Sequence, residues 1–204
     1  MAEKVTIVVV TDPMCSWCWG MAQDLQHTRE TLADVVQFKL MLGGINTHGT
    51  QPIGDYGRRF LMRLWREVEA TTGQTFGDTL PESYVHNSIA ACVAIETVRQ
   101  RHDEAAAFDA LHVLQEAFFL HGTDITSREV LTSLLAQFNV HEEDLAQASA
   151  DPSTKELLRF QFDAAGAYGT NAMPSLLIEQ SNELKLLAGG YVDANMMHTL
   201  ISRQ

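Results

Sequence analysis

The feature that most constrains the fold is a short β-branched run that leads directly into a pair of cysteines. Residues 4–10 (KVTIVVV) are typical of a strand buried on both faces. Thr11-Asp12-Pro13 ends this strand, because proline removes a backbone donor, and a helical pattern runs from about Ser16 to Leu32. Residues 35–42 (VVQFKLML) form a second apolar strand, closed by Gly43-Gly44. This order predicts a βαβ unit with parallel strands and a right-handed crossover.

A block without strand patterns follows. Apolar residues recur there at helical spacing, which predicts helices at about 55–70, 82–101, 103–120, 127–138 and 152–168. Two start signals support these boundaries. One is a capping box formed by Thr126 and Glu129, and the other is Asp151-Pro152, an N-cap followed by proline at the first helical position. The acidic run 142–144 indicates the solvated start of a further helix.

The C-terminal part returns to strands. Residues 175–179 and 184–188 flank a polar turn at 180–183, which suits an antiparallel hairpin. Residues 192–203 predict a final helix. The order β-α-β, helices, β-β-α predicts an α/β domain made of two separated segments, 1–53 and 170–204. The helical block, 54–169, is then an insertion docked on that domain.

Charge and composition narrow the classes of function. The chain has 204 residues, of which 46% are hydrophobic, and a formal net charge of −12. A protein this acidic is repelled by phosphate backbones and by anionic lipid, so we expect no nucleic acid and no membrane as partner. No apolar run approaches the ~20 residues of a membrane span, and the N-terminus lacks a secretory cleavage site. We expect a cytoplasmic protein, whose moderate apolar content does not demand a dimer.

Two of the three cysteines are separated by two residues, in Cys15-Ser16-Trp17-Cys18. Residues i and i+3 share a helix face, so the two sulfurs can bond to each other. The first cysteine meets the positive end of the helix, which favours its thiolate. We therefore expect Cys15 to be the exposed nucleophile, and the more buried Cys18 to resolve the mixed disulfide.

The alternatives for this pair are half of a zinc site or an inert buried pair. Zinc needs two more ligands, yet there is no second C-x-x-C and the eight histidines form no ligand-type spacing. We therefore expect no metal. The third cysteine, Cys92, lies in an apolar helical stretch, SIAACVAIETV, where a buried unreactive thiol is favoured over a second redox role.

The segments D-P-M-C-S-W-C-W-G and A-M-P-S-L-L-I resemble the DsbA-like oxidoreductases, and most of all their FrnE-like branch of predicted disulfide isomerases. The resemblance implies a thioredoxin fold with a helical insertion. It also implies a cis bond at Met173-Pro174, beside the cysteine pair, whose loop offers backbone groups to an extended substrate. An ordinary trans proline at an edge strand is the alternative. The implied activity needs no cofactor beyond the Cys15–Cys18 disulfide, with glutathione as a candidate reductant.

The sequence departs from many relatives near the second cysteine. Residues 7–10 hold no ionisable group, whereas other thioredoxin-fold enzymes bury an acid there. Asp12 is the nearest carboxylate, and it either shapes the Asp-Pro turn, which we favour, or assists proton transfer. Ser16-Trp17 places no imidazole between the cysteines, which favours a moderate or reducing potential over a strongly oxidising one.

Four residues are candidates for substrate binding. Trp17 and Met173 predict a hydrophobic rim near the pair, together with Met14 and Trp19, although core packing is the alternative for at least one tryptophan. Pro174 is implied by the resemblance. The resemblance also places the turn that contains Asn87 towards the active-site groove.

The leading hypothesis is a thiol–disulfide oxidoreductase, of the isomerase or reductase kind, acting on disulfide-containing proteins, peptides or small thiols. The alternative is a glutathione-dependent transferase or isomerase, because kappa-class transferases and hydroxychromene-carboxylate isomerases share the insertion architecture. Those relatives lack the second cysteine, so the presence of Cys18 argues against them. A non-catalytic peptide-binding adaptor is a third, weaker possibility.

Overall fold

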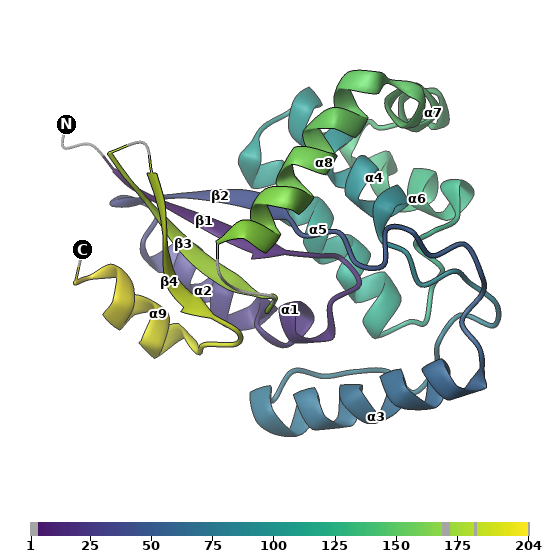
Figure 1. Cartoon of the computed structure of the whole chain (residues 1–204), viewed down its shortest axis with the longest axis horizontal. Helices are drawn as coiled ribbons and strands as arrows, with labels where there is room; N and C mark the ends of the chain where they lie inside the picture. The colour runs from purple at the N-terminus through teal and green to yellow at the C-terminus, as the bar shows by residue number, and fades with distance from the viewer. Residues whose placement is uncertain (1–3, 169–171, 182, 204) are drawn as a thin grey trace.

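The β-branched run near the N-terminus forms a central strand of a four-stranded sheet. In the computed structural model, which describes residues 4–168, 172–181 and 183–203, β1 (Val5–Thr11) lies between β2 (Val36–Leu42) and β3 (Ser175–Gln180). β1 runs parallel to β2 and antiparallel to β3. β4 (Glu183–Gly189) completes the order β2-β1-β3-β4 by pairing antiparallel with β3 (Figure 1). The predicted βαβ unit and C-terminal hairpin are confirmed.

The hairpin turn is tighter than the four residues predicted from the sequence. β3 ends at Gln180 and β4 begins at Glu183, so two residues connect them. The first, Ser181, has a left-handed backbone with φ 53°. The second, Asn182, lies outside the described residues.

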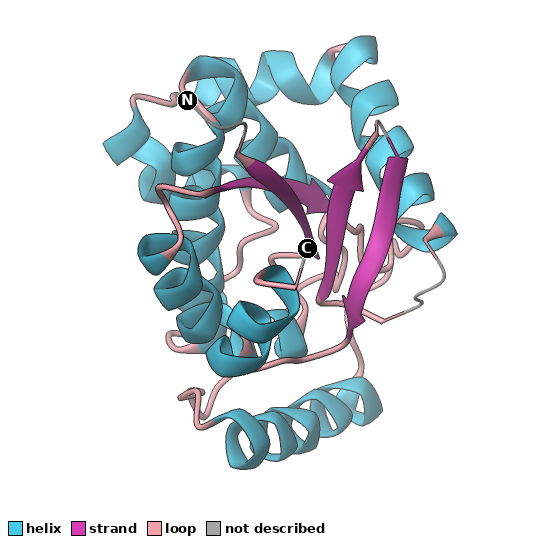
Figure 2. Cartoon of the chain, turned by 90° about the vertical axis from the view of Figure 1, so that its left-hand side faces the viewer, coloured by secondary structure: helices cyan, strands magenta, loops and turns pink. Residues whose placement is uncertain are grey.

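The helices are grouped in a large block between β2 and β3, with one pair before it and one helix after it (Figures 1 and 2). Their bounds are α1 (Ser16–Gly20), α2 (Ala22–Thr31), α3 (Asp55–Thr72), α4 (Ile89–Arg101), α5 (Glu104–Phe119), α6 (Arg128–Leu135), the 3-10 turn η1 (Ala136–Phe138), α7 (Glu142–Ala150), α8 (Pro152–Ala167) and α9 (Ala194–Ile201). None of these helices, within the part of the chain described, is long and apolar enough to cross a membrane.

Two predicted helices have different limits in the structure. The helix expected from Ser16 to Leu32 is broken at Met21, whose N–H contacts the carbonyls of Trp17 and Trp19. The helix expected over 82–101 begins only at Ile89. The preceding residues bond to a distant loop, as Ser88 N–H does to the carbonyl of Ile45 at 3.1 Å, instead of to a helical turn.

Of the two helix start signals predicted from the sequence, one is confirmed and one is wrong. Asp151 caps α8 by accepting from the N–H groups of Ser153 and Thr154, with Pro152 at the first position, as predicted. The Thr126–Glu129 capping box is wrong, because Ser127 is the N-cap of α6 and accepts from Val130 N–H. Thr126 instead donates its hydroxyl to Asp124 at 2.6 Å.

The two faces of the sheet pack against different helices. Ile7 and Val9 of β1 join the main core, which includes residues of α2 and α9, whereas Val8 and Val10 belong to a small cluster with Ala165 of α8. This alternation is the period of a strand buried on both faces. α8 is thus a cover for the sheet as well as a part of the helical block. The expected domain boundary at 169/170 lies outside the described residues.

Candidate functional site

The redox turn, residues 15–18, lies where β1 passes into α1. Cys15 is the N-cap of α1, and its Sγ accepts a hydrogen bond from the N–H of Cys18 at 3.3 Å. This contact satisfies one of the N–H groups that a helix start leaves without a backbone partner. The Sγ of Cys15 also donates to the carbonyl of Met173, 158 residues away, at 3.6 Å. The turn and the proline loop therefore meet at one sulfur.

Cys15 is less exposed than we expected from the sequence. Only 7% of its surface is accessible, against 4% for Cys18, so the prediction of an exposed nucleophile is corrected. The approach of the Met173 carbonyl to its sulfur accounts for part of this cover. The two cysteines differ mainly in their surroundings and not in their exposed area.

Burial raises the pKa of the Cys18 thiol well above its ordinary value, and the neighbouring Cys15 raises it further. The hydrogen bonds with Thr11 and Asp12 oppose this effect without cancelling it. All three cysteines of the chain are free thiols. Cys18 is thus held as a neutral thiol, which suits a residue that reacts only after Cys15 has bonded to a substrate.

The loop opposite the turn holds the proline singled out from the sequence. The Met173–Pro174 peptide bond is cis. Pro174 is buried and Met173 half-buried, with its side chain packed where a Cβ on Gly43 would lie. At the next residue, a Cβ on Gly44 would lie 2.7 Å from the ring of Phe162. The two glycines after β2 therefore leave room for one side chain from the proline loop and one from α8.

A buried carboxylate ties the redox turn to two other segments. Asp12 is 0% exposed, and its Oδ1 accepts from Met14 N–H at 2.8 Å, as in an Asx turn. Its Oδ2 accepts from Ile45 N–H at 3.0 Å and from the Ser88 hydroxyl at 2.6 Å. These contacts support the turn-shaping role that we favoured for Asp12. They also join the end of β1, the loop after β2 and the start of α4.

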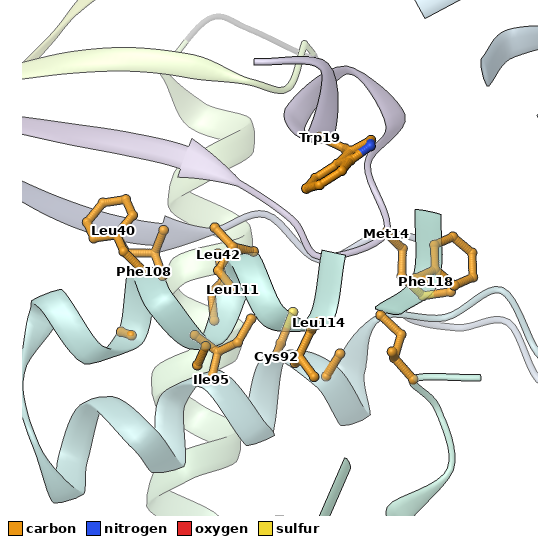
Figure 3. Close-up of a cluster of buried hydrophobic side chains, with 14 of the residues drawn as sticks. Met14, Trp19, Leu40, Leu42, Cys92, Ile95, Phe108, Leu111, Leu114 and Phe118 are labelled. Atoms are coloured by element: carbon orange, nitrogen blue, oxygen red, sulfur yellow. The ribbon is translucent and has the colours of Figure 1, made fainter. Parts of the chain in front are cut away.

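Cys92 lies against this carboxylate. Its Sγ donates to Asp12 Oδ2 at 3.8 Å, and the residue is 0% exposed, among the apolar side chains of the central core (Figure 3). Burial raises the pKa of Cys92 well above its ordinary value, and the charge of Asp12 adds to the effect. Burial also raises the pKa of Asp12, against its hydrogen bonds. The expected burial of Cys92 is confirmed.

The tryptophans of the motif have different roles. Trp19 is 3% exposed, stacks on Phe119 with the ring centres 6.0 Å apart and donates its indole N–H to the Thr75 carbonyl at 2.9 Å. Trp19 and Met14 are both part of the main hydrophobic core. Trp17 is half-buried, with its ring 6.4 Å from that of Tyr191. Of the tryptophans in the predicted hydrophobic rim, only Trp17 is thus partly exposed, and it lies beside Tyr191, which the prediction did not include.

Asn87 is half-buried at the start of α4, and its amide is engaged locally. It donates to the carbonyls of Thr47 and Gly49 at 3.2 and 2.9 Å and accepts from Ile89 N–H. The side chain thus holds the loop after β2. Asn87 also lines a cavity of about 700 Å³, which is a candidate binding surface.

Three features of the site were missed at the sequence level. Ser88 was not singled out, because nothing in the sequence around it indicates its bond to Asp12. The Gly43-Gly44 pair was interpreted as a strand end, although consecutive glycines are a signal for close packing. Tyr191 follows a second glycine pair, and its hydroxyl donates to Asp24 at 3.1 Å.

Among the described residues, no cluster of three His, Cys, Asp or Glu could hold a metal ion.

Comparison with solved structures shows the same fold in several oxidoreductases. A candidate protein disulfide isomerase from Nitrosomonas europaea has 24% identity and a TM-score of 0.87, over 98% of this chain and 97% of that one. The cytosolic disulfide reductase DsbM from Pseudomonas aeruginosa has 26% identity and a TM-score of 0.71, over 90% and 89%. The same reductase solved with GSH has a TM-score of 0.74, at 24% identity and the same coverage.

A 2-hydroxychromene-2-carboxylate isomerase shares the fold at 11% identity and a TM-score of 0.63, over 97% of this chain and 93% of that one. No curated protein matches the sequence. The family model Thioredoxin_5, described as Thioredoxin, matches residues 9–197, which include the cysteine pair and the proline loop. The protein is therefore a member of this family of DsbA-like thioredoxins, whose chemistry is thiol–disulfide oxidoreduction.

Proposed function

We propose that the protein is a cytoplasmic disulfide reductase or isomerase that works through Cys15 and Cys18. The observation that carries this proposal is the position of the Cys15 sulfur, between the N–H of Cys18 at 3.3 Å and the carbonyl of Met173 at 3.6 Å. A nucleophile at a helix start, a resolving thiol one turn later and a backbone acceptor for substrate are the parts that disulfide exchange needs.

In the first step the Cys15 thiolate attacks one sulfur of a substrate disulfide. An S–S bond forms to Cys15, and the other substrate sulfur leaves as a thiolate. Cys18 then loses its proton to solvent and attacks the Cys15 sulfur, which releases the second substrate thiolate. The substrate gains two electrons and two protons, and the protein is left with a Cys15–Cys18 disulfide, which a thiol such as glutathione reduces.

The substrate segment is proposed to lie beside Met173 and Pro174, with Trp17 at one margin and Asn87 at the other. A cytoplasmic setting, in which thiols are kept reduced, fits the reducing direction. The reductase from Pseudomonas, a relative of similar fold, is described as cytosolic and was solved with GSH. The absence of an imidazole between the cysteines supports a reducing potential as well.

Equilibration with glutathione redox buffers, read by mass spectrometry, tests the direction. We expect a reduction potential closer to about −270 mV than to about −120 mV. A value near the upper figure would contradict the reductase proposal and indicate an oxidase. Refolding of a scrambled disulfide protein then separates an isomerase, which restores native pairs, from a reductase, which only opens them.

The Cys18→Ser variant tests the pair against the glutathione-transferase alternative, which the fold of the hydroxychromene-carboxylate isomerase keeps in view. Disulfide exchange should stall in this variant, with mixed disulfides trapped on Cys15 and detectable by mass. Cys92→Ser is the matched control, because it removes a thiol outside the redox turn. Full activity of Cys18→Ser without trapped intermediates would favour the transferase.

A further inference from the structure

A groove beside the loop after β2 has an unusual charge for this protein. A cavity of about 700 Å³ lies between the loop after β2, the start of α4 and α8. The cationic residues Lys155 and Arg159 are among its lining residues, and none of the described residues that line it is acidic. In a chain with a net charge of −12, this is a local concentration of positive groups.

The floor of this groove is apolar. Val93 and Leu158 are buried there, Phe162 is half-buried and Ile89 keeps 38% of its surface exposed. An exposed apolar floor with a polar margin is typical of a site that accepts part of another molecule. The positive side chains and the apolar floor of the groove together suit an occupant that is both apolar and anionic.

The groove and the redox site are linked through the loop after β2. The ring of Phe162, which lines the groove, packs over Gly44, and the side chain of Met173 packs over Gly43. Two adjacent residues of this loop thus contact one side chain of the groove and one of the proline loop, whose Met173 carbonyl contacts Cys15. Asp12 fixes this junction, because its carboxylate holds both Ile45 and Ser88. A peptide bonded to Cys15 could continue into the groove within a few residues, since an extended chain advances about 3.3 Å per residue.

Lys155 is the cation best placed to select a charge. Its side chain is exposed and donates to the backbone carbonyl of Ala150 at 3.4 Å, and within the described part of the chain it forms no ion pair. Arg159 forms an ion pair with Asp163 at 3.2 Å, and both side chains are 70% exposed. Lys155 therefore carries the charge selection, and Arg159 contributes less.

We propose that this groove, which we call the arm groove, binds a substrate segment flanking the disulfide that carries an acidic residue next to a large apolar one. The proposal rests on the disulfide-exchange function proposed above and names the class of peptide that it prefers. The acidic side chain pairs with Lys155, and the apolar one covers Ile89 and Phe162.

The test uses reduced protein and three disulfide peptides that differ only in a four-residue arm, placed on either side of the disulfide. The arms contain Glu and Phe, Lys and Phe, or Glu and Ser. Each second-order rate constant is divided by that of the same variant with bis(2-hydroxyethyl) disulfide, which is too small to reach the arm groove. This ratio separates arm binding from the reactivity of the cysteine pair.

We expect the Glu-Phe arm to react about tenfold faster than the Lys-Phe arm, because the charge contact changes from attraction to repulsion. Replacing Phe by Ser should cost about fivefold, from lost apolar burial. Lys155→Glu should remove or invert the charge preference. Lys185→Glu, an exposed lysine on β4, should leave it unchanged.

Equal rates for the three arms would overturn the arm groove. A charge preference that falls equally in Lys155→Glu and Lys185→Glu would also overturn it, because the overall field of the protein would then be responsible. The failure of the underlying function has a different signature, since bis(2-hydroxyethyl) disulfide would then not react with wild-type protein at all.

Discussion

Two sites that contain thiols lie at the same end of β1, and different polar groups contact their sulfur atoms. In the redox turn, the Cys15 sulfur accepts a backbone N–H at a helix start and faces the proline loop. In the cluster of Asp12, Ser88 and Cys92, the sulfur donates to a carboxylate and is fully enclosed. In the second setting, burial and the neighbouring carboxylate oppose a negative sulfur.

Accessible area hardly distinguishes the proposed nucleophile from the third cysteine. Cys15 is 7% exposed and Cys92 0%. What separates them is the groups in contact with each sulfur, which are a backbone N–H and a carbonyl at Cys15 and a carboxylate at Cys92. The carboxylate beside Cys92 raises its pKa further, in addition to burial. The same carboxylate also positions the redox turn through Met14, so one charged group serves both regions.

The largest expected effect concerns Cys15, the proposed nucleophile. Cys15→Ser should reduce disulfide exchange at least about a thousandfold, because a hydroxyl does not replace a thiolate as nucleophile. Cys92→Ser should keep the rate within about threefold of wild type, because it removes only a buried thiol. The measurement is the second-order rate with bis(2-hydroxyethyl) disulfide. A comparable loss in both variants would contradict the division of roles.

The second expected effect concerns the carboxylate that joins the two regions. Asp12→Ala should lower the free energy of unfolding by about 3 kcal/mol, because it leaves the buried Met14 N–H and the buried Ser88 hydroxyl without their carboxylate acceptor. Asp34→Ala, at an exposed position, is the control and should change it by less than about 0.5 kcal/mol. Urea unfolding under reducing conditions provides the measurement. Equal stability of the two variants would show that the carboxylate does not anchor the turn.

A third effect follows from the buried thiols. The pKa values of Cys18 and Cys92 are raised in the folded state, so their contribution to stability is present below the ordinary thiol value of 9.0 and is lost as the pH rises through the raised values. We expect the free energy of unfolding to fall by about 1 kcal/mol for each of these thiols between pH 7 and pH 10. Cys92→Ala should show a shallower fall. An identical slope in the variant would argue against a neutral buried thiol at position 92.

The smallest expected effect concerns the aromatic margin of the redox turn. Trp17→Ala should slow reaction with an apolar disulfide peptide about fivefold, and with small polar oxidised glutathione by less, because the lost contact is apolar. Tyr56→Ala, which removes an aromatic that is 77% exposed on α3, is the control. If both substrates slow equally, Trp17 tunes the cysteines and does not bind substrate. If neither slows, the margin is not used.

Much of the fold follows from local patterns in the sequence. The continuous apolar run in 4–10 indicates a strand buried on both faces, residues 35–42 indicate a second apolar strand, and Asp151-Pro152 marks the start of α8. The errors arise where non-local bonds compete with local ones. Residues 82–88 have a helical pattern, yet they bond to the loop after β2, and α4 starts at Ile89. Ser127 outcompetes its neighbour Thr126 as a cap, a choice that two adjacent hydroxyls leave open.

The site was predictable to a similar degree. The motif and its helix start identify Cys15 and Cys18, and resemblance identifies Met173 and Pro174. The contact between Asp12 and Ser88 spans 76 residues, and no periodicity indicates it. The low exposure of Cys15 depends on a loop 158 residues away, which the sequence pattern around the cysteine does not report.

Competitive alkylation of the fully reduced protein at pH 6, read by peptide mass spectrometry, tests the central claim most directly. If the helix start and the proline loop make Cys15 the nucleophile, it should be labelled before Cys18 and well before Cys92. Denatured protein, in which the three thiols share one environment, gives the reference rates. Equal labelling of the three cysteines in the folded protein, or preferential labelling of Cys92, would contradict the account.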